Sequence, residues 1–178
     1  MLPNDEIRRL LREHDDPDHM ERPKDFDLVV AAKRFGELVH TLKERFGPAC
    51  LSGLGQDTSY YGGITVPIEA SGFELPVWVL FSNFGGFVTV GTGGEGAPGA
   101  ERGLAREFLT WLDGACDKID CVFVPVELLL EPYDGGSVLE QMYAESLLAA
   151  LAAEHGWDDE DDEETLPPVW YDRYFQYM

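Results

Sequence analysis

Four short apolar segments in the middle of the chain constrain its fold more than any other feature. They are rich in β-branched and aromatic residues, as strands are, and read CLSGLG, YYGGITVPI, ELPVWVLFS and FVTVG. The last three are separated by EASGF and NFGG, connections that are short enough for hairpins. In ELPVWVLFS both alternating sets of side chains are apolar, which is typical of a central strand covered on both faces. The sequence therefore predicts an antiparallel meander.

Helical periodicity flanks these strands on both sides. Apolar residues recur at helical spacing over 4–14 and over 26–46, and the second stretch ends at a Gly-Pro pair. Further helices are predicted at 101–116 and 137–156, with CVFVPVELLL between them as another strand. The expected fold class is α+β: an antiparallel sheet of four or five strands packed against helices, with N-terminal helices and a short C-terminal aromatic helix.

A chain of 178 residues fits one domain with appendages. We expect, in chain order, an N-terminal helix (1–14), a polar linker (15–25), a globular α+β domain (26–156), an acidic loop (157–167) and an aromatic segment (168–178). No apolar run approaches the roughly 18 residues of a membrane-spanning helix. The N-terminus also lacks the apolar stretch of a signal peptide. The sequence therefore predicts a cytoplasmic protein that does not bind membranes.

Charge is distributed unevenly along the chain, whose net charge is −21. Most of the 13 basic residues precede Phe46, and none lies between Phe46 and Glu101 or between Ile119 and Asp172. Such a surface repels nucleic acid and anionic membranes and attracts basic partners. Adaptation to high salt, or simple solubility, is the alternative, although either would spread the acids evenly. We predict a basic protein partner and no direct binding of nucleic acid.

The C-terminal sequence joins an acidic run to an aromatic segment. The consecutive acids are Asp158, Asp159, Glu160, Asp161, Asp162, Glu163 and Glu164. After two prolines, aromatic residues recur at helical spacing and include Trp170, Tyr171, Tyr174 and Phe175, with Asp172, Arg173 and Gln176 on the polar side. A helix this short is unstable alone in water, so it must dock on its own domain or on a partner. In the second case these acids and aromatic residues are the predicted partner-binding site.

The stretch GTGGEG matches the G-x-G-x-x-G pattern of dinucleotide sites through Gly91, Gly93 and Gly96. Such a site needs the third glycine at the start of a helix, where free N–H groups meet the pyrophosphate. Here Ala97-Pro98-Gly99 intervenes, and the preceding strand is expected to belong to a hairpin. A flexible loop is the favoured interpretation, and ligand binding by the Gly-rich loops of 83–99 is the alternative.

Other catalytic patterns are missing from the sequence, which has no G-x-S-x-G serine, no Walker A loop and no H-E-x-x-H. The segment His14–His19 groups ligand-type residues, but Pro17 and the polar surroundings favour a solvated hinge over a metal site. Cys50, Cys116 and Cys121 are too few for a disulfide framework and are predicted to be buried thiols. The sequence predicts no catalytic residue, no cofactor and no metal.

The leading functional prediction is a non-enzymatic, acidic protein-binding module that neutralises a basic partner. In its size, acidity and lack of catalytic motifs the chain resembles bacterial immunity proteins, which implies an inhibitor of a toxic nuclease. Three alternatives stay open. They are a small-molecule-binding domain or enzyme that uses the 83–99 loops, a DNA mimic, and a homo-oligomer whose C-terminal tails exchange.

Overall fold

The structure is a computed structural model that describes residues 1–56, 58–135 and 167–176. Five strands form a single sheet in the order of the chain: β1 (Leu51–Leu54), β2 (Tyr60–Val66), β3 (Val77–Ser82), β4 (Phe87–Thr92) and β5 (Val122–Phe123). The first four strands pair antiparallel, which confirms the predicted meander. β5 pairs with β4 in parallel.

The central strand is β3, whose six residues are all buried. Its side chains alternate between two core clusters, with Val77, Val79 and Phe81 on one face and Trp78 and Leu80 on the other. This burial confirms the prediction made from the double apolar pattern. A strand of this kind requires cover on both faces of the sheet.

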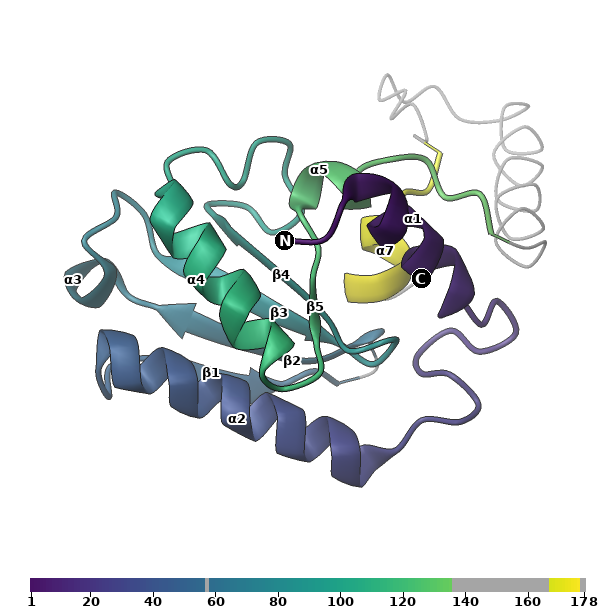
Figure 1. Cartoon of the computed structure of the whole chain (residues 1–178), viewed down its shortest axis with the longest axis horizontal. Helices are drawn as coiled ribbons and strands as arrows, with labels where there is room; N and C mark the ends of the chain where they lie inside the picture. Colours follow the sequence, from purple (N-terminus) through teal and green to yellow (C-terminus); the bar gives the residue numbers. More distant parts are fainter. Residues whose placement is uncertain (57, 136–166, 177–178) are drawn as a thin grey trace, which may run out of the picture.

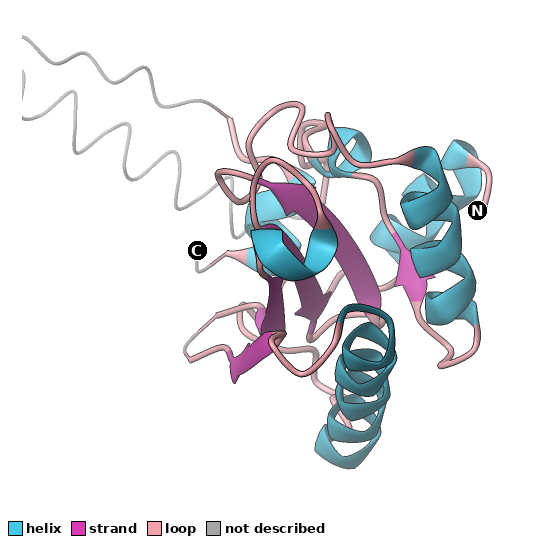
Figure 2. Ribbon diagram, turned by 90° about the vertical axis from the view of Figure 1, so that its left-hand side faces the viewer, coloured by secondary structure: helices cyan, strands magenta, loops and turns pink. Residues whose placement is uncertain are grey.

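Separate groups of helices provide that cover (Figure 1). On the face of Val79 lie α2 (Leu28–Phe46) and α4 (Arg106–Asp117). On the face of Leu80 lie α1 (Asn4–Glu13), α5 (Val126–Leu129) and α7 (Trp170–Phe175). A single turn, α3 (Ile68–Ser71), connects β2 to β3. The side view shows the twisted sheet between helices, and the α+β class is confirmed (Figure 2).

The sequence of α2 explains both its packing and its start. Its buried residues recur at helical spacing and are Ala31, Phe35, Leu38 and Leu42. Asp27 caps the helix, because its Oδ1 accepts hydrogen bonds from the N–H groups of Val29 (2.9 Å) and Val30 (3.1 Å). The cap fixes the direction in which the α1–α2 loop enters the helix.

The helix predicted at 101–116 begins only at Arg106 and ends at Asp117. Gly99 (φ 76°) and Gly103 (φ 93°) adopt the left-handed backbone before it, so the chain turns there instead of forming a helix. Glu101 lies in these turns, where its carboxylate accepts a hydrogen bond from the N–H of Val126 at 2.7 Å. The predicted start was wrong. Leu104 is apolar and buried like the inward residues of α4, but it lies in these turns and not in the helix.

The strand predicted for CVFVPVELLL is also largely wrong. Only Val122 and Phe123 pair with β4, and Val126–Leu129 form α5. Pro125 has no N–H to donate to a sheet, and its φ of −58° suits the entry to a helix. The helix predicted at 137–156 lies outside the described residues. Among the residues that are described, no helix is long and apolar enough to cross a membrane.

Candidate functional site

A hollow of about 610 Å³ forms where the α1–α2 loop, the N-terminal half of α2 and the β3–β4 turn meet. The carboxylates in its wall come from separate parts of the chain and are Glu13, Asp15, Asp16, Asp25, Asp27 and Asp120. The basic side chains in the wall are Arg34 and His14. A concave surface with such an excess of acids concentrates negative potential and attracts cations. This acidic hollow is the candidate site.

The turn between β3 and β4 brings two walls of the acidic hollow together. Gly85 (φ 58°) and Gly86 (φ 66°) both adopt the left-handed backbone that side chains disfavour. A Cβ on Gly85 would lie 2.9 Å from the rings of His14 and Phe87. The glycines therefore allow the end of α1 to approach the turn closely.

A buried ion pair holds the loop wall of the hollow in place. Arg173 of α7 donates from Nε to Asp15 Oδ1 at 2.7 Å, and the two side chains are 1% and 6% exposed. Its other N–H groups donate to backbone carbonyls of the same loop, those of Asp16, His19 and Met20. The guanidinium also lies 4.2 Å from the centroid of the Phe84 ring. Arg173 was predicted on the polar side of its helix and is buried instead, because the loop satisfies its donors.

Tyr133 completes this network by donating from its hydroxyl to Asp15 Oδ2 at 2.6 Å. Burial, and then the hydrogen bond to Asp15, raises the pKa of the Tyr133 phenol. The hydroxyl therefore remains protonated and a donor across the physiological range. Asp15 is held by Arg173 and Tyr133 together, so it supports the hollow and is not free to bind an external cation.

Three further acids of the hollow are also engaged by the chain itself. Glu13 pairs with Arg9, and Asp27 caps α2. Asp16 accepts a hydrogen bond from the backbone N–H of Lys24 at 2.9 Å and pairs with His19. The N–H of Lys24, and then His19, lowers the pKa of the Asp16 carboxyl. The carboxylates of these three acids are therefore engaged by partners within the chain itself.

Asp25 and Asp120 differ from the other acids of the hollow. Both are exposed, and no hydrogen bond or ion pair joins their carboxylates to another described residue. Asp120 (φ 54°) is also the one residue other than glycine with a positive φ in the described ranges. Aspartate tolerates this conformation better than most side chains. These two carboxylates are the best placed to meet a cation from outside.

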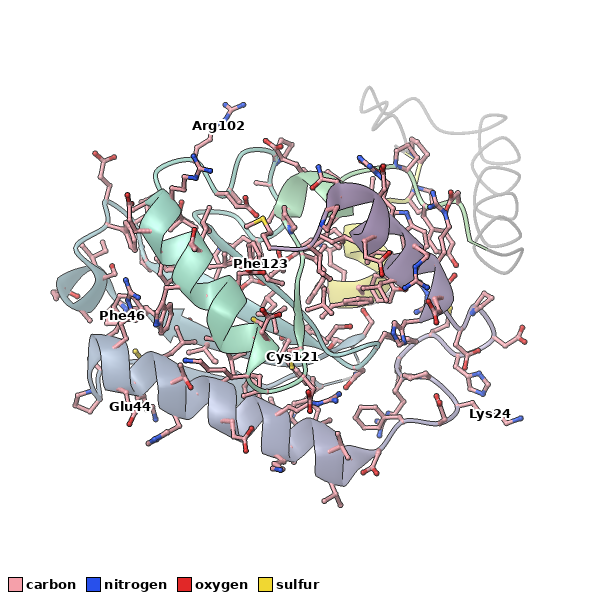
Figure 3. The ribbon with its side chains drawn as sticks, in the orientation of Figure 1. Lys24, Glu44, Phe46, Arg102, Cys121 and Phe123 are labelled. Atoms are coloured by element: carbon pink, nitrogen blue, oxygen red, sulfur yellow. The ribbon has the colours of Figure 1, made fainter. Side chains whose placement is uncertain are left out.

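Among the basic residues that the sequence concentrates near the N-terminus, Arg8 and Arg12 pair with acids from distant segments. Arg8 lies 2.7 Å from Glu131, and Arg12 lies 2.7 Å from Asp134, so acids distant in sequence neutralise them. Lys24 projects from the α1–α2 loop into solvent (Figure 3). These pairs reduce the positive charge of the N-terminal segment in a chain whose net charge is −21.

The predicted partner-binding residues divide between two parts of the chain. The acidic run Asp158–Glu164 lies outside the described residues. The aromatic residues Trp170, Tyr171, Tyr174 and Phe175 are between 0 and 3% exposed and pack against α1 and α5. The Tyr174 hydroxyl donates to the Leu11 carbonyl, and α1 and α7 lie side by side (Figure 1). In the structure the aromatic segment docks on its own domain.

Two glycines of the G-x-G-x-x-G stretch, Gly91 and Gly96, make room for aromatic rings. A Cβ on Gly91 would overlap the Trp78 indole, and one on Gly96 would overlap the Tyr171 ring. Gly93 (φ 74°) and Gly96 (φ 70°) also adopt the left-handed backbone in this loop. α4 begins well beyond the stretch, at Arg106. Packing therefore accounts for Gly91 and Gly96, and the left-handed backbone accounts for Gly93, without a bound nucleotide.

The cysteines are free and buried, as the sequence predicts. Burial raises the pKa of the Cys116 thiol well above its ordinary value and that of Cys121 to about 12. Cys121 directly precedes β5 and lies near the C-terminal end of α4 (Figure 3). In the described part of the chain, no group of three or more His, Cys, Asp or Glu residues is placed to hold a metal ion. The segment His14–His19 instead wraps around Arg173.

Sequence reasoning missed Asp25 and Asp120 as site residues. They lie far apart in the chain, on a loop and before β5, and neither belongs to a motif. The nearest signal is the N-cap pattern at Asp27, which marks the start of α2 and so one wall of the hollow. Comparison of the chain with protein-family models, with curated proteins and with solved structures gives no match.

Proposed function

We propose that this chain is a non-enzymatic binding protein that recognises a basic partner protein and neutralises it, in the manner of an immunity or inhibitor protein. The observation that carries the proposal is the acidic hollow, in which six carboxylates surround one arginine and one histidine. Net charge supports it, because a chain at −21 attracts cationic surfaces over several ångströms before contact.

Recognition would begin with electrostatic steering, which accelerates association and depends on ionic strength. A lysine or arginine side chain of the partner would then enter the hollow and meet Asp25 and Asp120. Phe26 lies in the same wall and offers an aromatic surface for the cation. Asp15 and Arg173 would hold the loop without exchanging partners.

The aromatic segment takes a different part in this proposal from the one that the sequence suggested. Trp170 and Tyr174 are packed in the core, so they would stabilise the domain that carries the binding surface and would not contact the partner. The acidic run Asp158–Glu164 stays a proposed part of the partner surface, through its charge alone.

The first test measures binding of a fluorescent lysine-rich peptide to the full chain. We expect Asp25→Asn combined with Asp120→Asn to weaken binding about tenfold at low salt, since each exposed charge pair contributes up to about 1 kcal/mol. Raising the salt to about 0.5 M should abolish binding by the wild type, because the Debye length falls to a few ångströms.

The matched control is Glu69→Gln combined with Glu74→Gln, which removes the same charge at exposed positions outside the hollow. We expect it to weaken binding about twofold or less. Equal losses of affinity in the two double variants would show that binding depends on the net charge of the chain and not on the hollow. That result would contradict the hollow as the binding site.

A second test identifies the natural partner. The intact protein and a variant with 158–164 changed to Asn and Gln are used to capture proteins from native lysate at low and high salt. We expect a basic protein that is captured by the wild type, released by salt, and held less well by the Asp25→Asn and Asp120→Asn variant. Captured proteins without an excess of lysine and arginine would contradict the proposal.

A further inference from the structure

β1 is an edge strand that the described part of the chain leaves open. It pairs with β2 on one side, and no described strand lies on its other side. All four of its residues are exposed, with Leu51 at 70% and Leu54 at 64%. The opposite edge of the sheet, β5, has only two residues and both are at least partly buried. Proteins commonly shield an open edge with charged residues or proline, and β1 has neither.

The hydrogen-bonding pattern shows which backbone groups of β1 point outward. Gly55 donates its N–H to the Tyr61 carbonyl at 2.9 Å, so Gly55 is a hydrogen-bonded position of the β1–β2 pair. Such positions alternate along an antiparallel pair. The N–H and C=O groups of Ser52 and Leu54 therefore point away from β2, toward the open edge.

The β1 strand and the residues that flank it in sequence carry no charge. Between Phe46 and Gln56 there is no Asp, Glu, Lys or Arg, in a chain whose net charge is −21. A basic partner would be drawn to the acidic surfaces and not to this edge. A second copy of the chain is repelled over most of the surface, so an uncharged edge is where two copies approach at the lowest electrostatic cost.

We propose that β1 is a self-association surface, on which β1 of a second copy pairs antiparallel about a two-fold axis at Gly53. In this register Ser52 faces Leu54 of the second copy, and their outward N–H and C=O groups satisfy one another. Gly53 lies at the axis, opposite Gly53 of the second copy. No atom of its own copy lies within 4 Å of the place of its Cβ, so this position is open to the second strand. The sheet then runs continuously through both copies.

Apolar side chains beside the edge extend the contact. Leu54 lines a depression together with Leu28 at the start of α2 and the rings of Phe26 and Tyr61. Glu21 and Arg22, which have opposite charges, lie in the same lining. Leu28 is 59% exposed and Leu54 is 64% exposed. Pairing would remove this apolar surface from water on both copies, in addition to joining the backbones.

The association has a salt dependence opposite to that of binding a basic partner. Two copies with the same large charge repel, and added salt screens the repulsion, so self-association strengthens as ionic strength rises. Binding of a basic partner weakens under the same change. The two proposals are therefore independent, and each can fail without the other.

The test is sedimentation of the full chain over a range of concentrations at about 0.05 M and about 0.5 M salt. We expect the mass to rise from 19.9 kDa toward twice that value with concentration, and to rise more at high salt. Ser52→Pro removes an outward N–H without costing a bond to β2, and Leu54→Lys places a charge on the edge. Both variants should remain at 19.9 kDa under all conditions.

Leu75→Lys is the matched control, since Leu75 is an exposed leucine (48%) outside β1 and the same charge is added there. It should associate as the wild type does. Two results would overturn the proposal: a wild-type mass that stays at 19.9 kDa throughout, or equal effects of Leu54→Lys and Leu75→Lys. Circular dichroism of each variant shows that the fold is retained.

Discussion

Arg173 links the two ends of the described structure. It belongs to α7, yet its guanidinium donates hydrogen bonds to the loop that follows α1. The same group lies over the rings of Phe84 and Tyr174. A buried cation of this kind is stabilised only while all of its donors are satisfied. Its single charge therefore couples the position of α7 to the shape of the acidic hollow.

Arg173→Met should lower the free energy of unfolding by about 3–5 kcal/mol, because Asp15 is left buried with an unpaired charge. Adding Asp15→Asn should recover part of that loss, since the uncompensated carboxylate is removed. Urea unfolding of the two single variants and the double variant measures the coupling. A loss below about 1 kcal/mol for Arg173→Met, or no recovery in the double variant, would contradict this account.

Glu101 is a second residue whose ionisation acts on stability. It lies in the turns before α4 and accepts the N–H of Val126, and burial is the main cause that raises the pKa of its carboxyl. A raised pKa in the folded state means that protonated Glu101 favours folding. This contribution is complete below the ordinary pKa of about 4.3 and is lost as pH rises through the folded value.

Glu101→Gln should therefore raise the melting temperature at pH 7, because the neutral amide can still accept from Val126 without a buried charge. The difference from the wild type should shrink as pH falls toward about 4, where Glu101 itself becomes protonated. Thermal unfolding followed by circular dichroism across this range tests the prediction. A variant that melts below the wild type at neutral pH would show that the carboxylate charge stabilises the fold.

At the scale of elements, the β4–α4 connection shows how packing determines a loop that resembles a motif. The chain leaves β4 at Thr92 and turns repeatedly before α4 begins at Arg106. Gly91, near the end of β4, faces the Trp78 indole. Gly96, within the connection, faces the Tyr171 ring, which belongs to α7. The loop thus closes over the same core cluster that holds the C-terminal helix.

Gly91→Ala should lower the free energy of unfolding by about 1–3 kcal/mol, because the added methyl group overlaps the Trp78 ring in a filled core. Gly94→Ala is the control in the loop that follows β4, since its Cβ would meet only the Ala97 side chain at 3.6 Å. Denaturant unfolding of both variants distinguishes the positions. Equal stabilities would mean that the core relaxes around Gly91 and that packing does not explain the glycine.

Most elements could be predicted because their signals are local. The apolar stripe of α2 and the double apolar pattern of β3 each lie within a single continuous segment. The predictions failed where a turn or a proline competed with an apolar run, as at Glu101 and Pro125. At Glu101 the local structure depends on a hydrogen bond to Val126, and at Pro125 it depends on the missing N–H group. The spacing of apolar residues contains no information about either.

At the scale of the whole molecule, two electrostatic surfaces with opposite salt dependence follow from one composition. The acidic hollow concentrates negative charge around Asp25 and Asp120, and the β1 edge carries no ionised residue from Phe46 to Gln56. Under the two proposals, salt would weaken the attraction of a basic partner at the first surface and the repulsion between copies at the second. Measurements at two ionic strengths therefore report on the two surfaces separately.

The sequence by itself determined the α+β class, the central place of β3 and the excess of acids, since these depend on periodicity and composition. Only the tertiary structure decided that Arg173 is buried, that Asp25 and Asp120 share a hollow, and that β1 is an open edge. Each of these features joins segments far apart in the chain. Such pairings arise from the packing of the whole domain, and no local pattern of residues specifies them.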